Sequence, residues 1–130
     1  MADLLNTRVL LVDDSPIWRT FLTAHLYDAG LSSVYVAHDG VQAVRKAASL
    51  QPDLVLMDVR LPRMNGIEAA SLIREVAPLA KVVFLSSSSD PEVRDAALNA
   101  GGCDYIVKSL AGRQLIIAIQ RALQRDAESA

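Results

Sequence analysis

Short apolar runs, each followed at once by a polar residue, recur along this chain of 130 residues. The runs occupy residues 9–12, 54–57, 82–85 and 105–107. They are continuously apolar rather than alternating, which is typical of strands covered on both faces in a parallel sheet. Parallel strands end at the same edge of their sheet, where open α/β folds bind ligands. We therefore expect the polar residues that follow these runs to meet at one edge.

Helical patterns separate the strand candidates, which we place at 8–12, 33–37, 53–57, 81–85 and 104–107. Ser15 and Pro16 supply a cap and a proline at the first helical position, and Gly30 ends that helix. Further helices are expected from the start signals Asp39-Gly40, Gly66 and Asp90-Pro91, and over about 111–125. Parallel strands need crossover helices, so this alternation predicts a doubly wound α/β fold.

Length and composition predict a single globular domain over residues 1–130. The hydrophobic fraction of 52% and the charged fraction of 22% exclude general disorder. A net charge of −2 without a basic stripe argues against direct nucleic-acid binding. The single Cys103 is expected to be a small buried residue in a reducing compartment. Neither a signal peptide nor an apolar run of the roughly 20 residues that a membrane span needs is present, so a cytoplasmic protein is expected.

Five polar residues follow the four apolar runs: Asp13, Asp14, Asp58, Ser86 and Lys108. Carboxylates repel one another, so three of them at one edge imply a hard cation, and Mg²⁺ is the usual choice for oxygen ligands. Taken alone, the acidic pair could instead stabilise the N-terminal end of the first helix. Asp58 alone could equally be a capping or turn residue. Together with Lys108, the cluster suits phosphoryl chemistry.

These residues stand in four motifs that resemble the response regulator receiver domain, the phospho-accepting module of two-component signalling. The motifs are VLLVDDS at 9–15, DLVLMDVRLPRMNG at 53–66, VVFLS at 82–86 and DYIVK at 104–108. The resemblance covers about residues 8–125. It implies a flavodoxin-like sheet of five parallel strands in the order 2-1-3-4-5, with two helices on one face and three on the other.

The resemblance also assigns an acceptor and a metal site. Asp58 would accept a phosphoryl group from a sensor histidine kinase or a phosphotransfer protein and form an acyl phosphate. Asp13, Asp14 and Asp58 would hold Mg²⁺ or Mn²⁺ together with the main-chain carbonyl of Arg60. Lys108 would bind a phosphoryl oxygen after transfer. Such a chain catalyses only its own phosphotransfer and dephosphorylation, so it would be a signalling acceptor rather than an enzyme.

A switch is implied as well. The Ser86 hydroxyl would turn inward to hydrogen-bond the phosphoryl group, and Tyr105 would change between exposed and buried rotamers. The signal would reach an output domain or a target protein, and phosphorylation could also drive dimerisation. No direct contact with nucleic acid or membrane is expected.

Two positions depart from the family's pattern. Ser109 follows Lys108 where the family usually has proline, often after a cis peptide bond. We predict a trans bond here, because a cis bond before a non-proline residue costs about 2.5–4 kcal/mol. Receivers whose fifth strand is followed by Lys-Ser, as in Val107-Lys108-Ser109, resemble those attached to helix-turn-helix output domains. Trp18 is the second departure, and it is either a lid over the metal site or, as we prefer, a partly buried helix residue.

Other classes fit less well. The haloacid dehalogenase pattern needs Asp-x-Asp after one strand, whereas here the acidic pair is adjacent. A P-loop needs a Gly-x-x-x-x-Gly-Lys segment, which the sequence lacks. A flavodoxin-like cofactor carrier would need Ser, Thr or Gly after the first strand. The remaining alternative is a receiver-like interaction module that works without phosphorylation, and the complete set of polar residues speaks against it.

Overall fold

The computed structural model describes the backbone of residues 4–129 and the side chains of residues 4–124. The strands are β1 (Arg8–Val12), β2 (Ser33–Ala37), β3 (Leu54–Asp58), β4 (Lys81–Ser86) and β5 (Gly102–Val107). The helices are α1 (Pro16–Asp28), α2 (Gly40–Leu50), α3 (Gly66–Val76), α4 (Pro91–Asn99), the short 3-10 helix η1 (Lys108–Leu110) and α5 (Ala111–Ser129). Residues 1–3 and 130 of the predicted 1–130 domain lie outside the described residues.

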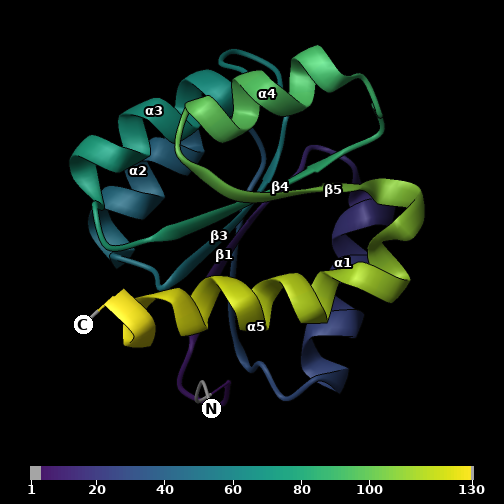
Figure 1. Cartoon of the computed structure of the whole chain (residues 1–130), viewed down its shortest axis with the longest axis vertical. Helices are drawn as coiled ribbons and strands as arrows, with labels where there is room; N and C mark the ends of the chain where they lie inside the picture. The colour runs from purple at the N-terminus through teal and green to yellow at the C-terminus, as the bar shows by residue number, and fades with distance from the viewer. Residues whose placement is uncertain (1–3, 130) are drawn as a thin grey trace.

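The strands form one sheet in the order β2-β1-β3-β4-β5, and each neighbouring pair is parallel. Helices α2, α3 and α4 cover one face of the sheet, and α1 and α5 cover the other (Figure 1). Both the predicted strand order and the division of the helices between the two faces are confirmed. No helix in the described part of the chain is both long and apolar enough to cross a membrane.

Burial of the sheet on both faces explains why the strand segments are continuously apolar. In β1, Val9 and Leu11 pack in the core beneath α1 and α5, whereas Leu10 and Val12 pack beneath α2, α3 and α4. Successive side chains of a strand point to opposite faces, so every position needs an apolar residue when both faces are covered. The periodicity seen in the sequence is thus a direct consequence of the two helix layers.

Helix starts follow the predicted capping signals. Ser15, Asp39 and Asp90 each accept a backbone N–H of the following first turn, which would otherwise lack a partner. Gly30 follows α1 with a φ of 101°, a conformation that favours glycine. The cap of α3 is Asn65, and Gly66 is the first residue of that helix.

Several details differ from the expectations. Asp58 pairs with Leu85 and Ser86 with Val107, so β3 and β4 each include the polar residue that was predicted to follow the strand. Strand β5 begins at Gly102, two residues earlier than predicted. The expectation that Cys103 is buried is wrong, because it is partly exposed at the margin of the core beneath α1 and α5.

Candidate functional site

Four strand ends bring the predicted polar residues to the same edge of the sheet. Asp13 follows β1, Asp58 ends β3, Ser86 ends β4, and Lys108 follows β5. These residues are nearly covered, with exposed fractions of 1%, 5%, 1% and 9%, respectively. Asp14, next to Asp13, is exposed. The structure thus places four buried polar or charged residues at the sheet edge where the strand-end argument predicted them.

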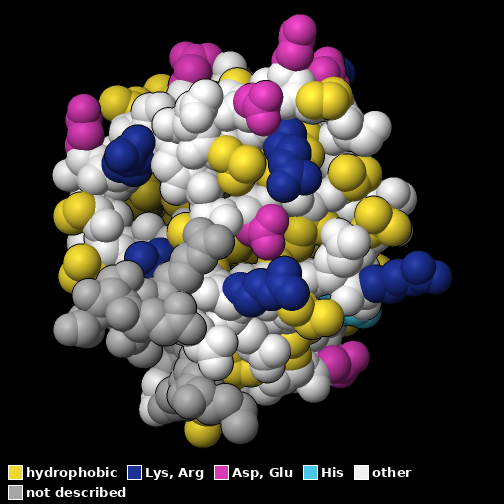
Figure 2. All heavy atoms as spheres, in the orientation of Figure 1, with side chains coloured by type: hydrophobic (Ala, Val, Ile, Leu, Met, Phe, Trp, Pro, Cys, Tyr) yellow, Lys and Arg dark blue, Asp and Glu magenta, His cyan; other side chains and the backbone are white. Residues whose placement is uncertain are grey.

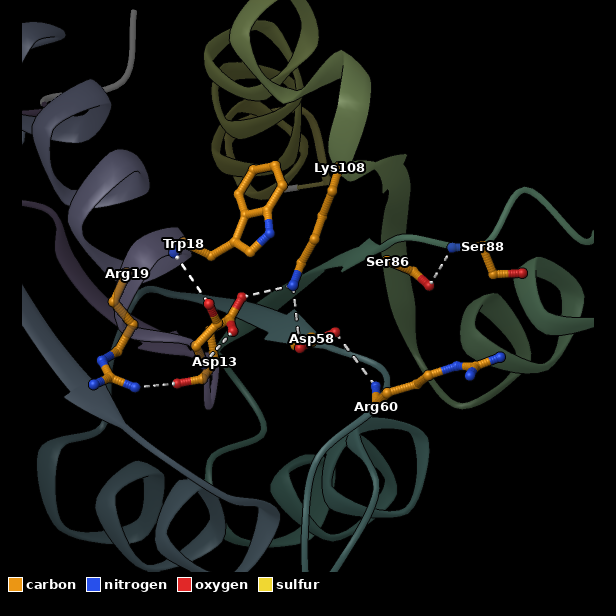
Figure 3. Close-up of polar contacts among 9 residues, drawn as sticks. Asp13, Trp18, Arg19, Asp58, Arg60, Ser86, Ser88 and Lys108 are labelled. Carbon is orange, nitrogen blue, oxygen red and sulfur yellow. Dashed lines mark hydrogen bonds and ion pairs between the residues drawn. The ribbon is translucent and has the colours of Figure 1, made fainter.

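Lys108 forms the centre of this set. Its Nζ lies 2.9 Å from Asp13 Oδ2 and 3.3 Å from Asp58 Oδ2. Figure 3 shows the lysine side chain passing beside the Trp18 ring to reach both carboxylates. A buried charge is expensive unless it is paired. The ammonium group therefore stabilises both carboxylates, and they in turn offset the cost of burying it.

The acidic group has the composition of a site for a hard cation. Ligand oxygens of Asp13, Asp14 and Asp58 all lie within 4.8 Å of one another. Asp13 Oδ1 accepts the Ser15 N–H at 2.9 Å, whereas the buried Asp13 Oδ2 forms the ion pair with the Lys108 ammonium. The Arg60 N–H donates to Asp58 Oδ1 at 3.3 Å, so the backbone of Arg60 lies against this carboxylate. Carboxylate and carbonyl oxygens are the ligands that Mg²⁺ takes, so these residues fit the ion.

The site sets the protonation of Asp58. Burial raises the pKa of Asp58 from its usual 3.8 to about 6. The Lys108 ammonium opposes this rise by attraction, and the Asp13 carboxylate adds to it by repulsion. Asp58 is therefore mainly ionised at pH values above about 6, and its ionised form is the one that can act as a nucleophile.

A glycine allows the Asp58 backbone to lie against the start of α3. The Gly66 N–H donates to Val59 O at 2.8 Å. A Cβ atom at Gly66 would lie only 2.0 Å from the carbonyl oxygen of Asp58. Any larger residue would have to displace the end of β3, so this contact fixes the position of Asp58 relative to the helix.

Ser86 and Tyr105, the predicted switch pair, are joined through Ser88. Ser86 Oγ accepts the Ser88 N–H at 3.1 Å, and the Tyr105 hydroxyl donates to Ser88 O at 2.8 Å. Tyr105 is buried in this state. Figure 3 shows the Ser86 hydroxyl pointing toward Ser88 rather than toward Asp58. The sequence did not single out Ser88, because it lies in a run of four serines with nothing to distinguish its members.

Two further contacts were not predicted. The Arg19 guanidinium donates to the carbonyl oxygen of Asp13 at 3.0 Å. Trp18 is partly buried, as preferred from the sequence, and its ring also lies beside Lys108, with 5.1 Å from Nζ to the ring centroid. The described chain has no cis peptide bond, so the predicted trans bond between Lys108 and Ser109 is confirmed.

The family described as Response regulator receiver domain matches residues 9–120. This chain belongs to that family. It is accordingly a receiver domain of two-component response regulators, as the motifs suggested.

Relatives of different lengths share this receiver. The chain is 34% identical over 117 residues to the chemotaxis protein CheY of Thermotoga maritima, covering 90% of this chain and 98% of that protein. It is 39% identical over 123 residues to the transcriptional regulatory protein PdtaR of Mycobacterium tuberculosis, covering 93% of this chain and 58% of PdtaR. The crystal structure of the CheX–CheY–BeF3–Mg²⁺ complex from Borrelia burgdorferi contains a chain with a TM-score of 0.83 and 29% identity, covering 88% of this chain and 87% of that one.

Proposed function

We propose that this receiver accepts a phosphoryl group on Asp58 from a sensor histidine kinase or a phosphotransfer protein in the cytoplasm. One observation carries the proposal. Asp58 is a buried carboxylate whose Oδ2 lies 3.3 Å from the Lys108 ammonium and whose oxygens lie close to those of two further carboxylates. Residues 1–130 would act as one such domain, with no catalysis beyond its own phosphorylation and dephosphorylation.

The transfer uses an ionised Asp58. A carboxylate oxygen forms the new bond to phosphorus while the bond from phosphorus to the donor breaks and the leaving group keeps the electron pair. Asp13, Asp14, Asp58 and the main-chain carbonyl of Arg60 would hold Mg²⁺ or Mn²⁺, which would neutralise charge on the phosphoryl oxygens. The BeF3 and Mg²⁺ named for the Borrelia complex support the choice of a phosphoryl-like group and this metal.

Lys108 would change partners during the transfer. Before it, the ammonium balances Asp13 and Asp58 at 2.9 and 3.3 Å. Phosphorylation adds about −1.5 to −2 charge and three acceptor oxygens. The ammonium can then bind a phosphoryl oxygen without crossing the site, because Asp58 itself carries the new group.

Ser86 would turn toward the phosphoryl group and give up its hydrogen bond with the Ser88 N–H. Hydrogen bonds to charged groups contribute about 1.5–3 kcal/mol each, so Ser86 and Lys108 together could supply about 3–6 kcal/mol. Inverting a 1:99 equilibrium requires about 5.5 kcal/mol. The new contacts are therefore strong enough to populate a pre-existing minor state.

The output surface would be formed by α4, β5 and α5. A hollow of about 330 Å³ lies there, lined in part by Arg94, Asp104, Tyr105 and Arg121. Tyr105 both lines this hollow and bonds Ser88 O, so a movement of Ser86 and Ser88 would alter the surface. On the face in Figure 2, acidic, basic and hydrophobic side chains lie interspersed. Such a surface suits an output domain, a target protein or a second receiver better than nucleic acid.

Phosphorylation by acetyl phosphate with Mg²⁺ tests the proposal. Intact-mass spectrometry should show one added phosphoryl group on the wild-type chain and none on Asp58→Asn. Asp53→Asn is a matched control, because Asp53 lies just before the opposite end of β3. It should be phosphorylated like the wild type. Addition to Asp58→Asn would refute the acceptor assignment, and no addition to the wild type would favour the interaction module that works without phosphorylation.

A further inference from the structure

Trp18 presents its ring to the ammonium group of Lys108. The distance from Lys108 Nζ to the ring centroid is 5.1 Å, within the range of about 6 Å over which a cation is attracted to an aromatic face. Lys108 is nearly buried, and so are its partners Asp13 and Asp58. Limited access of water strengthens the attraction of the ring for the cation.

A row of aromatic side chains on α1 holds this ring in place. Trp18 packs edge-to-face against Phe21, with centroids 5.6 Å apart and an angle of 89°. Phe21 stacks on His25 at 5.0 Å. His25 Nε2 lies 3.3 Å from the carbonyl oxygen of Gly112, near the start of α5. The row therefore connects α1 with the helix that begins shortly after Lys108.

We infer that Trp18 is a positioning residue for Lys108: the indole face holds the ammonium at the acceptor and covers the α1 side of its side chain. This inference rests on the phosphoryl transfer proposed above. Lysine has a flexible four-carbon stem, so its ammonium has many alternative positions. Attraction to a ring face tolerates a shift of the cation. Trp18 can thus retain the ammonium while it moves from the carboxylates to a phosphoryl oxygen.

Apolar packing is the competing explanation, since Trp18 also packs against the core beneath α1 and α5. Two substitutions separate the explanations. Trp18→Phe keeps an aromatic face. Trp18→Met has no aromatic face but keeps an apolar side chain of good helix propensity. Tyr27→Leu is the matched control, because Tyr27 is an exposed aromatic residue near the other end of α1.

The rate of phosphorylation by acetyl phosphate with Mg²⁺, followed by intact mass, distinguishes these variants. Trp18→Met should slow phosphorylation by about 2- to 25-fold, the range that a cation–aromatic contact supports. Trp18→Phe should remain within about twofold of the wild type, and Tyr27→Leu should match it. Urea denaturation should give similar midpoints for the two Trp18 variants. Equal rates for them, whether slowed or not, would overturn the inference.

Fluorescence tests the contact without any phosphoryl donor, because Trp18 is the single tryptophan of the chain. Lys108→Met should change its emission, whereas Lys108→Arg, which keeps a cation, should stay near the wild type. Identical spectra for all three would overturn the inference. The three proteins could differ in emission as expected while the wild type is not phosphorylated. That result would refute the proposed function and leave the contact between Trp18 and Lys108 standing.

Discussion

Asp58→Asn should make the folded protein more stable at alkaline pH, although it removes the residue proposed as acceptor. The ionised side chain of Asp58 is buried beside the Asp13 carboxylate, and its attraction to Lys108 only partly offsets the loss of hydration. Asparagine has nearly the same shape and no charge. The substitution should therefore relieve an unfavourable burial that the site requires for its chemistry.

The magnitude follows from the pKa of Asp58. A carboxyl with a pKa of about 6 in the folded protein and 3.8 in the unfolded chain keeps its proton up to a higher pH in the folded state. Between these values the unfolded state binds fewer protons, so stability falls as pH rises. At pH 8 the ionisation of Asp58 lowers the free energy of unfolding by at most about 3 kcal/mol. At pH 4 this loss is below about 1 kcal/mol, because the carboxyl is then largely protonated in the folded state.

Urea denaturation of both proteins at pH 4 and pH 8, with a chelator present, measures this difference. The exposed Asp95 on α4 offers a control, and Asp95→Asn should change the unfolding free energy by less than about 0.5 kcal/mol at either pH. Adding Mg²⁺ at pH 8 should stabilise the wild type more than Asp58→Asn, which lacks one of the ligands. An Asp58→Asn protein no more stable than the wild type at pH 8 would refute the reasoning.

Three other substitutions test the surroundings of the site. Gly66→Ala should lower the free energy of unfolding measured in urea by about 1–3 kcal/mol, because its Cβ would lie 2.0 Å from a β3 carbonyl oxygen. Gly112→Ala, in helix α5, meets nothing nearer than 3.9 Å and should leave this free energy unchanged or raise it by up to about 1 kcal/mol. Ser86→Ala should still be phosphorylated. Its response to a phosphoryl mimic, measured by amide hydrogen exchange in α4 and β5, should be weaker than that of the wild type by about 1.5–3 kcal/mol. An undiminished response would contradict the switch. Tyr105→Phe removes the 2.8 Å bond to Ser88 O and should destabilise the protein by about 0.5–1.5 kcal/mol in urea, and unchanged stability would show that this bond contributes nothing.

The positions of the site residues could be predicted from the sequence because they depend on local patterns. A continuously apolar segment indicates a strand buried on both faces, and the next polar residue then lies at the strand's end. This reasoning predicted, without any knowledge of distances, that Asp13, Asp58, Ser86 and Lys108 lie at one edge of the sheet. The alternation of strands with capped helices predicted the parallel order in the same way. Strand limits were less certain, since β3 continues through Asp58 by pairing with Leu85.

Only the tertiary structure decided how these residues interact. Lys108 is far along the chain from Asp13 and from Trp18. Local sequence does not give the 2.9 Å distance from its ammonium to Asp13 Oδ2, nor does it place that ammonium beside the Trp18 ring. The pKa of Asp58 likewise depends on how completely folding removes water from it. Ser88 became identifiable only when β5 placed the Tyr105 hydroxyl against its carbonyl oxygen. Periodicity and capping determine which element a residue belongs to, whereas its partners and its charge state depend on the packing of elements that are distant in the sequence.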